Sequence, residues 1–160
     1  MKTWIFQGTP DEYRVDQYLR IDEDIIWDVR QKHFRDKILE GDMVFIWRSK
    51  GFSGDESSCG IVAKGKILCK PAELPDEKEY LYVKKPSNWK YIGWRVKIRL
   101  SEVRLNGRQG MLRKISHIKG NDVLKNMRIM NINRETNYKL SKIEAEEIEK
   151  LWKSRRRIRN

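Results

Sequence analysis

The distribution of apolar and polar residues predicts short buried strands that alternate with short helices. The strongest strand pattern is Met-Val-Phe-Ile-Trp at residues 43–47, which is too short for an independent helix and suits a strand buried on both faces. Gly41 and Asp42 precede this run and favour a left-handed helix cap followed by a turn. We therefore expect residues 43–47 to form the central strand of a sheet.

Other segments also have strand patterns. Residues 94–100 alternate strictly, so one face of that strand is apolar and the other is entirely cationic. Gly65 interrupts another apolar segment and predicts a bulge or a bend. Strands are expected over residues 3–7, 60–69, 79–83 and 94–100, with a further short apolar stretch at 25–29.

Helical patterns lie between these strands. Thr9, Pro10 and Glu12 form a helix-start signature, because Thr9 can cap, Pro10 suits the first helical position and Glu12 completes a capping box. Ser141 and Glu144 form a second capping box, which starts a C-terminal helix. The remaining helices are expected over residues 31–40, 110–118 and 122–130, with a loop at 71–78 and a polar connector at 131–138.

Chain length and net charge limit the classes of function that the protein can have. The 160 residues suit one domain with one core, which we assign to residues 1–152, followed by a basic tail or linker at 153–160. Lys and Arg number 35 against 23 Asp and Glu, and the resulting net charge of +12 is typical of a nucleic-acid-binding domain. A basic but inert surface is the alternative. No apolar run approaches the roughly 20 residues of a membrane span and no signal-peptide pattern is present, so we expect no membrane association and a cytoplasmic protein.

The sequence offers little for catalysis or metal binding. Cys59 and Cys69 lack a CxxC motif or a neighbouring His cluster, so they predict neither a zinc site nor a disulfide framework. His33 and His117 are isolated and lie in predicted helices, where a structural role is the usual one. The carboxylates are scattered and no phosphate-binding glycine motif occurs. We therefore expect binding without chemistry, with no catalytic residue, no metal and no cofactor; an enzyme acting on a small substrate is a distant alternative.

The indoles are the strongest binding signal. The six Trp residues exceed what a core of this size needs, and they stand at 4, 27, 47, 89, 94 and 152. Trp47 ends the predicted central strand just before two cations, so it fits either a binding site or a core position at a strand terminus. Trp89 is a lone indole among cations, in a segment that Pro86 keeps irregular.

The order of motifs resembles the EVE domain over almost the whole chain. The matching segments are 4–10, Tyr13, Trp27, 41–47, 60–65, 94–96 and 136–141. EVE domains belong to the PUA-like superfamily and are related to YTH domains, which read methylated adenine in RNA. The resemblance implies an α+β fold, a compact and strongly bent β-sheet or barrel with helices packed around it. It also implies recognition of a modified base, as in the N-terminal DNA-reading domains of McrB-type modification-dependent restriction proteins. The family more often has Asn where Thr9 stands.

The residues and the resemblance lead to the same mechanism. A duplex hides the modified edge of a base, so a reader must flip the base out, at a cost of a few kcal/mol. Stacking on aromatic side chains returns about 1–3 kcal/mol for each base, and the positive charge adds nonspecific affinity. We expect the target to be methylated DNA; a module that reads a modified base in single-stranded RNA is the alternative. A restriction role would add a fused or associated NTPase or nuclease as a partner.

Individual residues can be assigned to this mechanism. By resemblance to the YTH cage, Trp27 matches the first wall of the pocket. The full set of candidates for the base pocket is Trp27, Trp47, Trp89, Tyr82, Asp28 and Ser49. The candidates for phosphate contacts are Arg48, Lys50, Lys90, Arg95 and Lys97.

Overall fold

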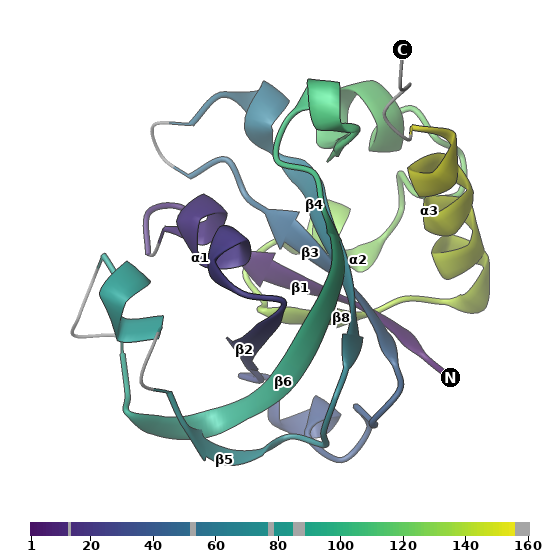
Figure 1. The fold of residues 1–160 in the computed structure, drawn as a ribbon. Helices are drawn as coiled ribbons and strands as arrows, with labels where there is room; N and C mark the ends of the chain where they lie inside the picture. Colours follow the sequence, from purple (N-terminus) through teal and green to yellow (C-terminus); the bar gives the residue numbers. More distant parts are fainter. Residues whose placement is uncertain (13, 52–53, 77–78, 85–88, 156–160) are drawn as a thin grey trace.

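The computed structural model describes residues 1–12, 14–51, 54–76, 79–84 and 89–155. Within this part of the chain, one mixed sheet of eight strands curls into a half-barrel flanked by helices (Figure 1). The strands are β1 (Thr3–Gly8), β2 (Asp24–Asp28), β3 (Met43–Arg48), β4 (Gly60–Ile67), β5 (Ala72–Pro75), β6 (Ile92–Val103), β7 (Leu112–Arg113) and β8 (Asn137–Lys139). The helices are α1 (Val15–Ile21), α2 (Arg128–Asn131) and α3 (Lys142–Ser154). The predicted α+β class with a strongly bent sheet is confirmed.

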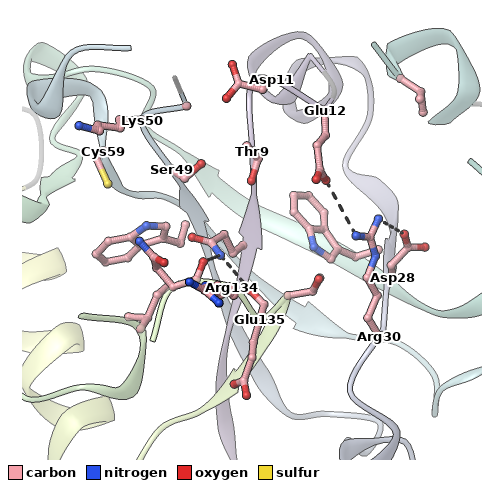
Figure 2. Close-up of a pocket in the computed structure, with 18 of the residues that line it drawn as sticks. Thr9, Asp11, Glu12, Asp28, Arg30, Ser49, Lys50, Cys59, Arg134 and Glu135 are labelled. Atoms are coloured by element: carbon pink, nitrogen blue, oxygen red, sulfur yellow. Dashed lines mark hydrogen bonds and ion pairs between the residues drawn. The ribbon is translucent and has the colours of Figure 1, made fainter. Parts of the chain in front are cut away.

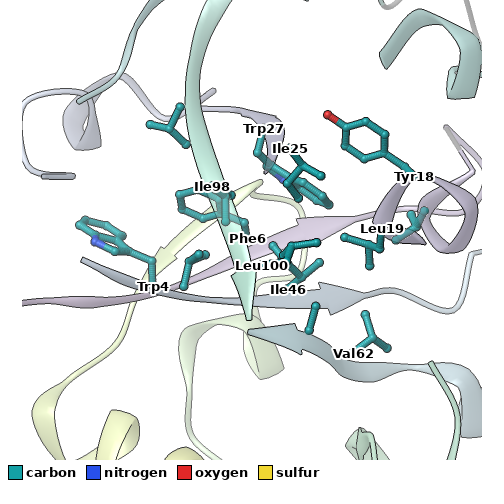
Figure 3. Packing of buried hydrophobic residues seen from close by; sticks show 14 of the residues in the cluster. Trp4, Phe6, Tyr18, Leu19, Ile25, Trp27, Ile46, Val62, Ile98 and Leu100 are labelled. Carbon is teal, nitrogen blue, oxygen red and sulfur yellow. The ribbon is translucent and has the colours of Figure 1, made fainter. Parts of the chain in front are cut away.

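The central position of β3 is also confirmed. The strand order is β2-β6-β4-β3-β1-β8, with β5 paired to β6 and β7 paired to β4. β3 pairs in parallel with β1 and antiparallel with β4. Val44 and Ile46 join one buried apolar cluster, which is drawn in Figure 3, whereas Phe45 and Trp47 join a second cluster together with Trp152 of α3. Burial on both faces explains why residues 43–47 are continuously apolar.

Gly41 and Asp42 fix the start of β3. Gly41 has a φ of +90°, in the left-handed region that favours glycine. The carboxylate of Asp42 accepts hydrogen bonds of 3.0 Å from Trp4 Nε1 and from the backbone N–H groups of Lys2 and Leu39. Burial acts to raise the pKa of Asp42, but these hydrogen bonds and the Lys2 ammonium outweigh it and hold the pKa below its ordinary value. An ionised carboxylate therefore ties β3 to β1.

Side-chain amides join the two edge strands, β2 and β8. Asn137 Nδ2 donates to the backbone O of Asp28 at 3.0 Å, and its Oδ1 accepts from the N–H of Arg30 at 3.1 Å. Gln31 Oε1 accepts from the N–H groups of Thr136 and Asn137 at 3.2 and 2.9 Å. The C-terminal ends of β1 and β3 lie beside the N-terminal ends of β8 and β4, and the amide bridges bring the C-terminal end of β2 to the start of β8.

Two local predictions are confirmed. The register between β4 and β6 shifts between Lys64 and Gly65, which is the predicted bulge. Ser141 Oγ accepts from the N–H of Glu144 and the Glu144 carboxylate accepts from the N–H of Ser141, so the predicted capping box starts α3. No helix in the described ranges is long and apolar enough to cross a membrane.

Several predicted helices were wrong. Residues 31–40 hold only one 3₁₀ helix, a turn at Lys32–Phe34. The side chain of Gln31 bonds to the remote backbone of Asn137 and that of Arg35 bonds to the O of Val29, so neither supports a longer helix. The first helix begins at Val15 and not at Pro10. Residues 110–118 form β7 and a π-helical turn, Lys114–Ile118, and only the end of 122–130 enters α2.

Three predictions about strands and loops were also wrong. Residues Glu79–Tyr82 form a 3₁₀ turn and not a strand. The predicted loop at 71–78 contains β5, and the predicted connector at 131–138 includes the first two residues of β8. Both strands are short, and each is held by pairing with a longer strand, β6 or β1, which local sequence patterns do not record.

Candidate functional site

A cavity of about 770 Å³ opens at the end of the half-barrel where these strand ends meet. Figure 2 shows Thr9 and Ser49 at the middle of the cavity, with Lys50 on one side and Asp28 and Arg30 on the other. The volume lies in the range of pockets that enclose drug-sized ligands, so a single nucleobase fits. Eight of the residues predicted for the site line this cavity, namely Trp27, Trp47, Trp89, Asp28, Ser49, Lys50, Lys90 and Arg95.

Two indoles belong both to the core and to the cavity wall. Trp27 lies in β2 and Trp47 in β3, strands that are not neighbours in the sheet, and the bend of the sheet brings both to the cavity. Trp27 is only 3% exposed and packs against Tyr18 with ring centroids 6.4 Å apart. Trp47 is 2% exposed and packs in the cluster of Phe45. Each indole can therefore offer a ligand only the small part of its surface that faces the cavity.

Trp89 is the most accessible of the three indoles. Its side chain is half-buried and meets the ring of Tyr91 edge-on, with centroids 6.1 Å apart. Lys90 follows it and is exposed. Pro86, which suggested an irregular segment, lies outside the described residues. Trp89 is therefore the aromatic wall whose removal disturbs the core least.

Ser49 presents an unused hydrogen-bonding group to the cavity. Its backbone N–H donates to the O of Gly8 at 3.0 Å, which fixes the end of β3 against the end of β1. Its side-chain Oγ is buried and has no hydrogen-bond partner among the described residues. A buried hydroxyl without a partner costs about 1–3 kcal/mol, so a ligand atom at this position would restore a lost interaction.

Asp28 has internal partners at the cavity wall. Arg95 Nε donates to Asp28 Oδ1 at 2.9 Å, and Arg30 Nη2 lies 3.4 Å from Asp28 Oδ2. The Arg95 guanidinium also donates to the backbone O of Leu74, at 2.8 Å, and to that of Tyr91, at 2.9 Å, and its side chain is 3% exposed. Arg95 therefore supports the wall from inside, and the structure does not leave its guanidinium open to a phosphate.

Three other predicted residues lie away from the cavity lining. Arg48 is buried, and its guanidinium bonds to the carboxylate of Asp16 at 2.9 Å and to the backbone O of Ser58 at 2.8 Å. Tyr82 packs against Tyr18, with centroids 5.6 Å apart. Lys97 lines a separate, smaller cavity beside β2 and β5. Arg48 acts as an internal tie because its side chain finds acceptors that are remote in the sequence.

Sequence reasoning missed part of the lining. Gln7 lies at the end of β1, and its Nε2 donates to the backbone O of Asn133 at 2.8 Å and to that of Glu135 at 2.9 Å. The segment from Asn133 to Thr136 thereby becomes one wall of the cavity. Parallel pairing of β1 with β3 is the signal that would have placed Gln7 beside the end of β3, but the pairing itself is not visible in the pattern.

The cavity rim carries basic side chains whose charge is not neutralised by its acidic side chains. Most rim acids are held in ion pairs, which join Glu12 to Arg30, Glu56 to Lys50 and Glu135 to Arg128. Hydrogen bonds from Lys50 and Arg128 lower the pKa of Glu56 and of Glu135 respectively, so both acids stay ionised near neutral pH. Lys90, Lys114 and Arg134 also line the cavity, and none of them forms an ion pair within the described ranges.

The described lining shows neither a reactive thiol nor a metal-binding cluster. Burial raises the pKa of the Cys59 thiol, which keeps this cavity residue protonated and weakly nucleophilic. Across the described residues, no group of three or more His, Cys, Asp or Glu side chains could hold a metal ion. Among its described residues the cavity provides aromatic surface, the buried unpaired hydroxyl of Ser49 and cations at the rim.

The family model for the EVE domain matches residues 2–151. The chain belongs to the EVE-domain family. No curated protein matches this EVE domain by sequence. Its fold agrees with the PUA-like architecture that the resemblance implied.

Solved structures with the same fold come from distant organisms. A hypothetical protein from Leishmania major has a TM-score of 0.66 and 15% identity, covering 96% of each chain. A protein from Pseudomonas syringae has a TM-score of 0.63 and 20% identity, covering 94% of this EVE domain and 99% of that chain. Human THYN1, solved in complex with DNA containing 5-methylcytosine, has a TM-score of 0.61 and 16% identity, covering 95% and 98%.

Proposed function

We propose that this EVE domain binds DNA that carries a modified base and takes that base, flipped out of the helix, into the cavity at the end of the half-barrel. The observation that carries this proposal is the lining itself, in which Trp27, Trp47 and Trp89 share one cavity with Ser49, whose buried hydroxyl is unpaired among the described residues. The described part of the cavity has room for one base, and its ligand needs both a flat apolar surface and a hydrogen-bonding edge.

The free energies of base flipping, stacking and hydrogen bonding are consistent with this proposal. Flipping a base costs a few kcal/mol, and stacking on an aromatic side chain returns about 1–3 kcal/mol. Trp27 and Trp47 are too deeply buried to stack over a full face, so Trp89 is the main stacking surface and the other two bound the cavity. The hydrogen bond to Ser49 adds about 0.5–1.5 kcal/mol and depends on the identity of the base edge.

Charge and fold support DNA as the target. The chain has a net charge of +12, and Lys90, Lys114 and Arg134 carry part of it to the cavity rim, where they can meet phosphates. THYN1, which has this fold, was solved with DNA containing 5-methylcytosine. A role as the specificity module of a restriction system, with an NTPase or nuclease as partner, stays a prediction from the family resemblance.

A competition experiment tests the proposal. Affinity is measured by fluorescence anisotropy for three matched probes: a duplex with one 5-methylcytosine, the unmodified duplex, and single-stranded RNA of the same sequence with 5-methylcytosine at the same position. We expect the modified duplex to bind most tightly. Tighter binding of the RNA probe would favour RNA as the target. Equal affinity for all three probes would contradict recognition of the modified base.

Trp89→Ala provides the structural control for that experiment. Loss of the stacking surface should weaken binding to the modified duplex by about 1–3 kcal/mol while leaving binding to the unmodified duplex nearly unchanged. Trp94→Ala is the matched control, because Trp94 is 37% exposed and lies outside the cavity lining. Discrimination that survives Trp89→Ala would exclude Trp89 as the stacking wall.

A further inference from the structure

A second group of basic side chains lies outside the cavity lining and begins next to Lys114 in the sequence. The N–H of Lys114 donates to the backbone O of Cys59 at 2.9 Å, and both residues line the cavity. The preceding residue, Arg113, ends β7 and pairs with Gly60 of β4. Its N–H donates to His117 Nδ1 at 2.9 Å, which fixes the imidazole over the start of the π-helical turn.

Arg155 completes this group from the end of α3. Its backbone O packs so closely on Gly110 that a Cβ at Gly110 would lie 2.1 Å from it. The Arg113 guanidinium packs on Gly107 in the same loop, where a Cβ would lie 2.6 Å from Nη2. Burial and the charges of Arg155 and Arg113 together lower the pKa of His117. Arg113 and Arg155 thus lie close enough to His117 to influence its charge. Asp55 is an acid near this group, and hydrogen bonds from Ser57, together with the charge of Arg113, lower the pKa of Asp55.

Some of the N–H donors in this group have no hydrogen-bond acceptor among the described residues. Arg113 Nε and Arg155 Nε are both buried, and neither has a hydrogen-bond partner in the part of the chain that the structure describes. A buried charged donor without an acceptor costs more than the roughly 1–3 kcal/mol of a neutral one, and such groups often mark the site of an ion or ligand. His117 adds a further donor, because its Nδ1 accepts a hydrogen bond and the neutral ring therefore carries its proton on Nε2.

We propose that Arg113, His117 and Arg155 bind a phosphodiester group of the same nucleic-acid strand whose base enters the cavity. This inference rests on the function proposed above and extends it by one anchoring site outside the base pocket. Planar guanidinium groups match the geometry of phosphate oxygens, and Arg113 directly precedes Lys114, which lines the cavity. A phosphate contact carries no information about the base, so the site positions the strand and does not select the modification.

Charge-removing variants test this assignment. Arg113→Gln and Arg155→Gln should each weaken binding to modified and unmodified duplexes by the same factor, and each should reduce the slope of log affinity against log salt by about one. Arg20→Gln is the control, because Arg20 is exposed on α1 and its substitution removes one positive charge at a different place on the protein. Thermal melts confirm that the variants are folded. Unchanged affinity and slope in both variants would overturn the assignment, as would a loss confined to the modified duplex.

An NMR titration distinguishes a bound strand from a free anion. The ring signals of His117 are followed while either inorganic phosphate or the unmodified duplex is added. Shifts with the duplex support the proposal, with or without shifts from phosphate, whereas shifts with phosphate alone overturn it. Because the unmodified duplex is sufficient here, these measurements stand even if the protein fails to discriminate modified bases, which would contradict only the proposed base recognition.

Discussion

Asn137 Nδ2 donates a hydrogen bond of 3.0 Å to the backbone O of Asp28, and this contact joins the two edge strands of the half-barrel beside the cavity. Asn137 is fully buried, and its Oδ1 also accepts from the N–H of Arg30 at 3.1 Å. One amide therefore serves the last residue of the strand that carries Trp27 and a backbone group two residues beyond it. The shape of the cavity depends on this bridge as well as on the pairing of strands.

Replacing Asn137 should destabilise the fold. Asn137→Ala leaves the O of Asp28 and the N–H of Arg30 without their partner, at a cost of about 1–3 kcal/mol for each group that stays buried. The free energy of unfolding is measured by urea denaturation. Asn131→Ala is the control, since Asn131 is exposed and its loss should change stability by less than about 0.5 kcal/mol. A loss no larger than in the control would show that the bridge is dispensable.

Asp42 should make stability depend on pH in the acid range. Its folded-state pKa lies below the unfolded value of about 3.9, so its contribution is complete above that value and is lost as pH falls through the folded pKa. Asp42→Asn removes this titration while keeping the side-chain shape. The difference in unfolding free energy between wild type and variant should be constant near neutral pH and shrink below about pH 4. A difference independent of pH would show that Asp42 titrates alike in both states.

The sequence predicts the framework of this fold because its strongest signals are local. Residues 43–47 are apolar at every position since both faces of β3 are buried, and the Ser141 capping box satisfies the first turn of α3 by itself. The candidate site follows from the same strand, because its end carries Trp47 and Ser49 to the cavity. Family resemblance adds Trp27, whose strand lies elsewhere in the sheet.

What could not be predicted depends on partners remote in the sequence. Arg48 and Arg95 look like surface cations, but the structure supplies each with a carboxylate, Asp16 or Asp28, and with backbone carbonyls. β8 has only three residues and forms because β1 and side-chain amides hold it. Neither the remote partners of these arginines nor the pairing of β8 produces a periodic pattern in the sequence. The sequence alone therefore predicts that the arginines lie on the surface and that β8 is part of a connector.

Trp27 is expected to affect both stability and recognition. Because it is 3% exposed, Trp27→Ala should lower the unfolding free energy by about 3–5 kcal/mol through the cavity it leaves, and all binding should fall with the folded fraction. Trp27→Phe is the informative variant, since it retains an aromatic core residue but moves the cavity wall. It should lower the ratio of modified to unmodified affinity in anisotropy measurements.

Trp152→Phe is the control for Trp27→Phe. Trp152 is equally buried, at 1% exposure, but packs in the other apolar cluster and lies outside the cavity lining. It should cost stability in thermal melts without changing the affinity ratio. If both variants leave the ratio unchanged, Trp27 is a core residue without a role in recognition.

Ser49 gives the sharpest separation between a ligand-binding role and a structural role. Its Oγ is buried without a partner in the described part of the protein, so Ser49→Ala removes an unsatisfied polar atom and should leave the free energy of unfolding unchanged or raise it by about 1–3 kcal/mol. The same change should weaken binding to the modified duplex by about 0.5–1.5 kcal/mol, the worth of one neutral hydrogen bond. Ser101→Ala is the matched control, because Ser101 Oγ donates to the O of Lys64 at 3.1 Å on the exposed surface. Urea denaturation and anisotropy on the same preparations give both quantities. A variant that is less stable than the parent and still binds the modified duplex equally well would show that the hydroxyl serves the fold and not the base.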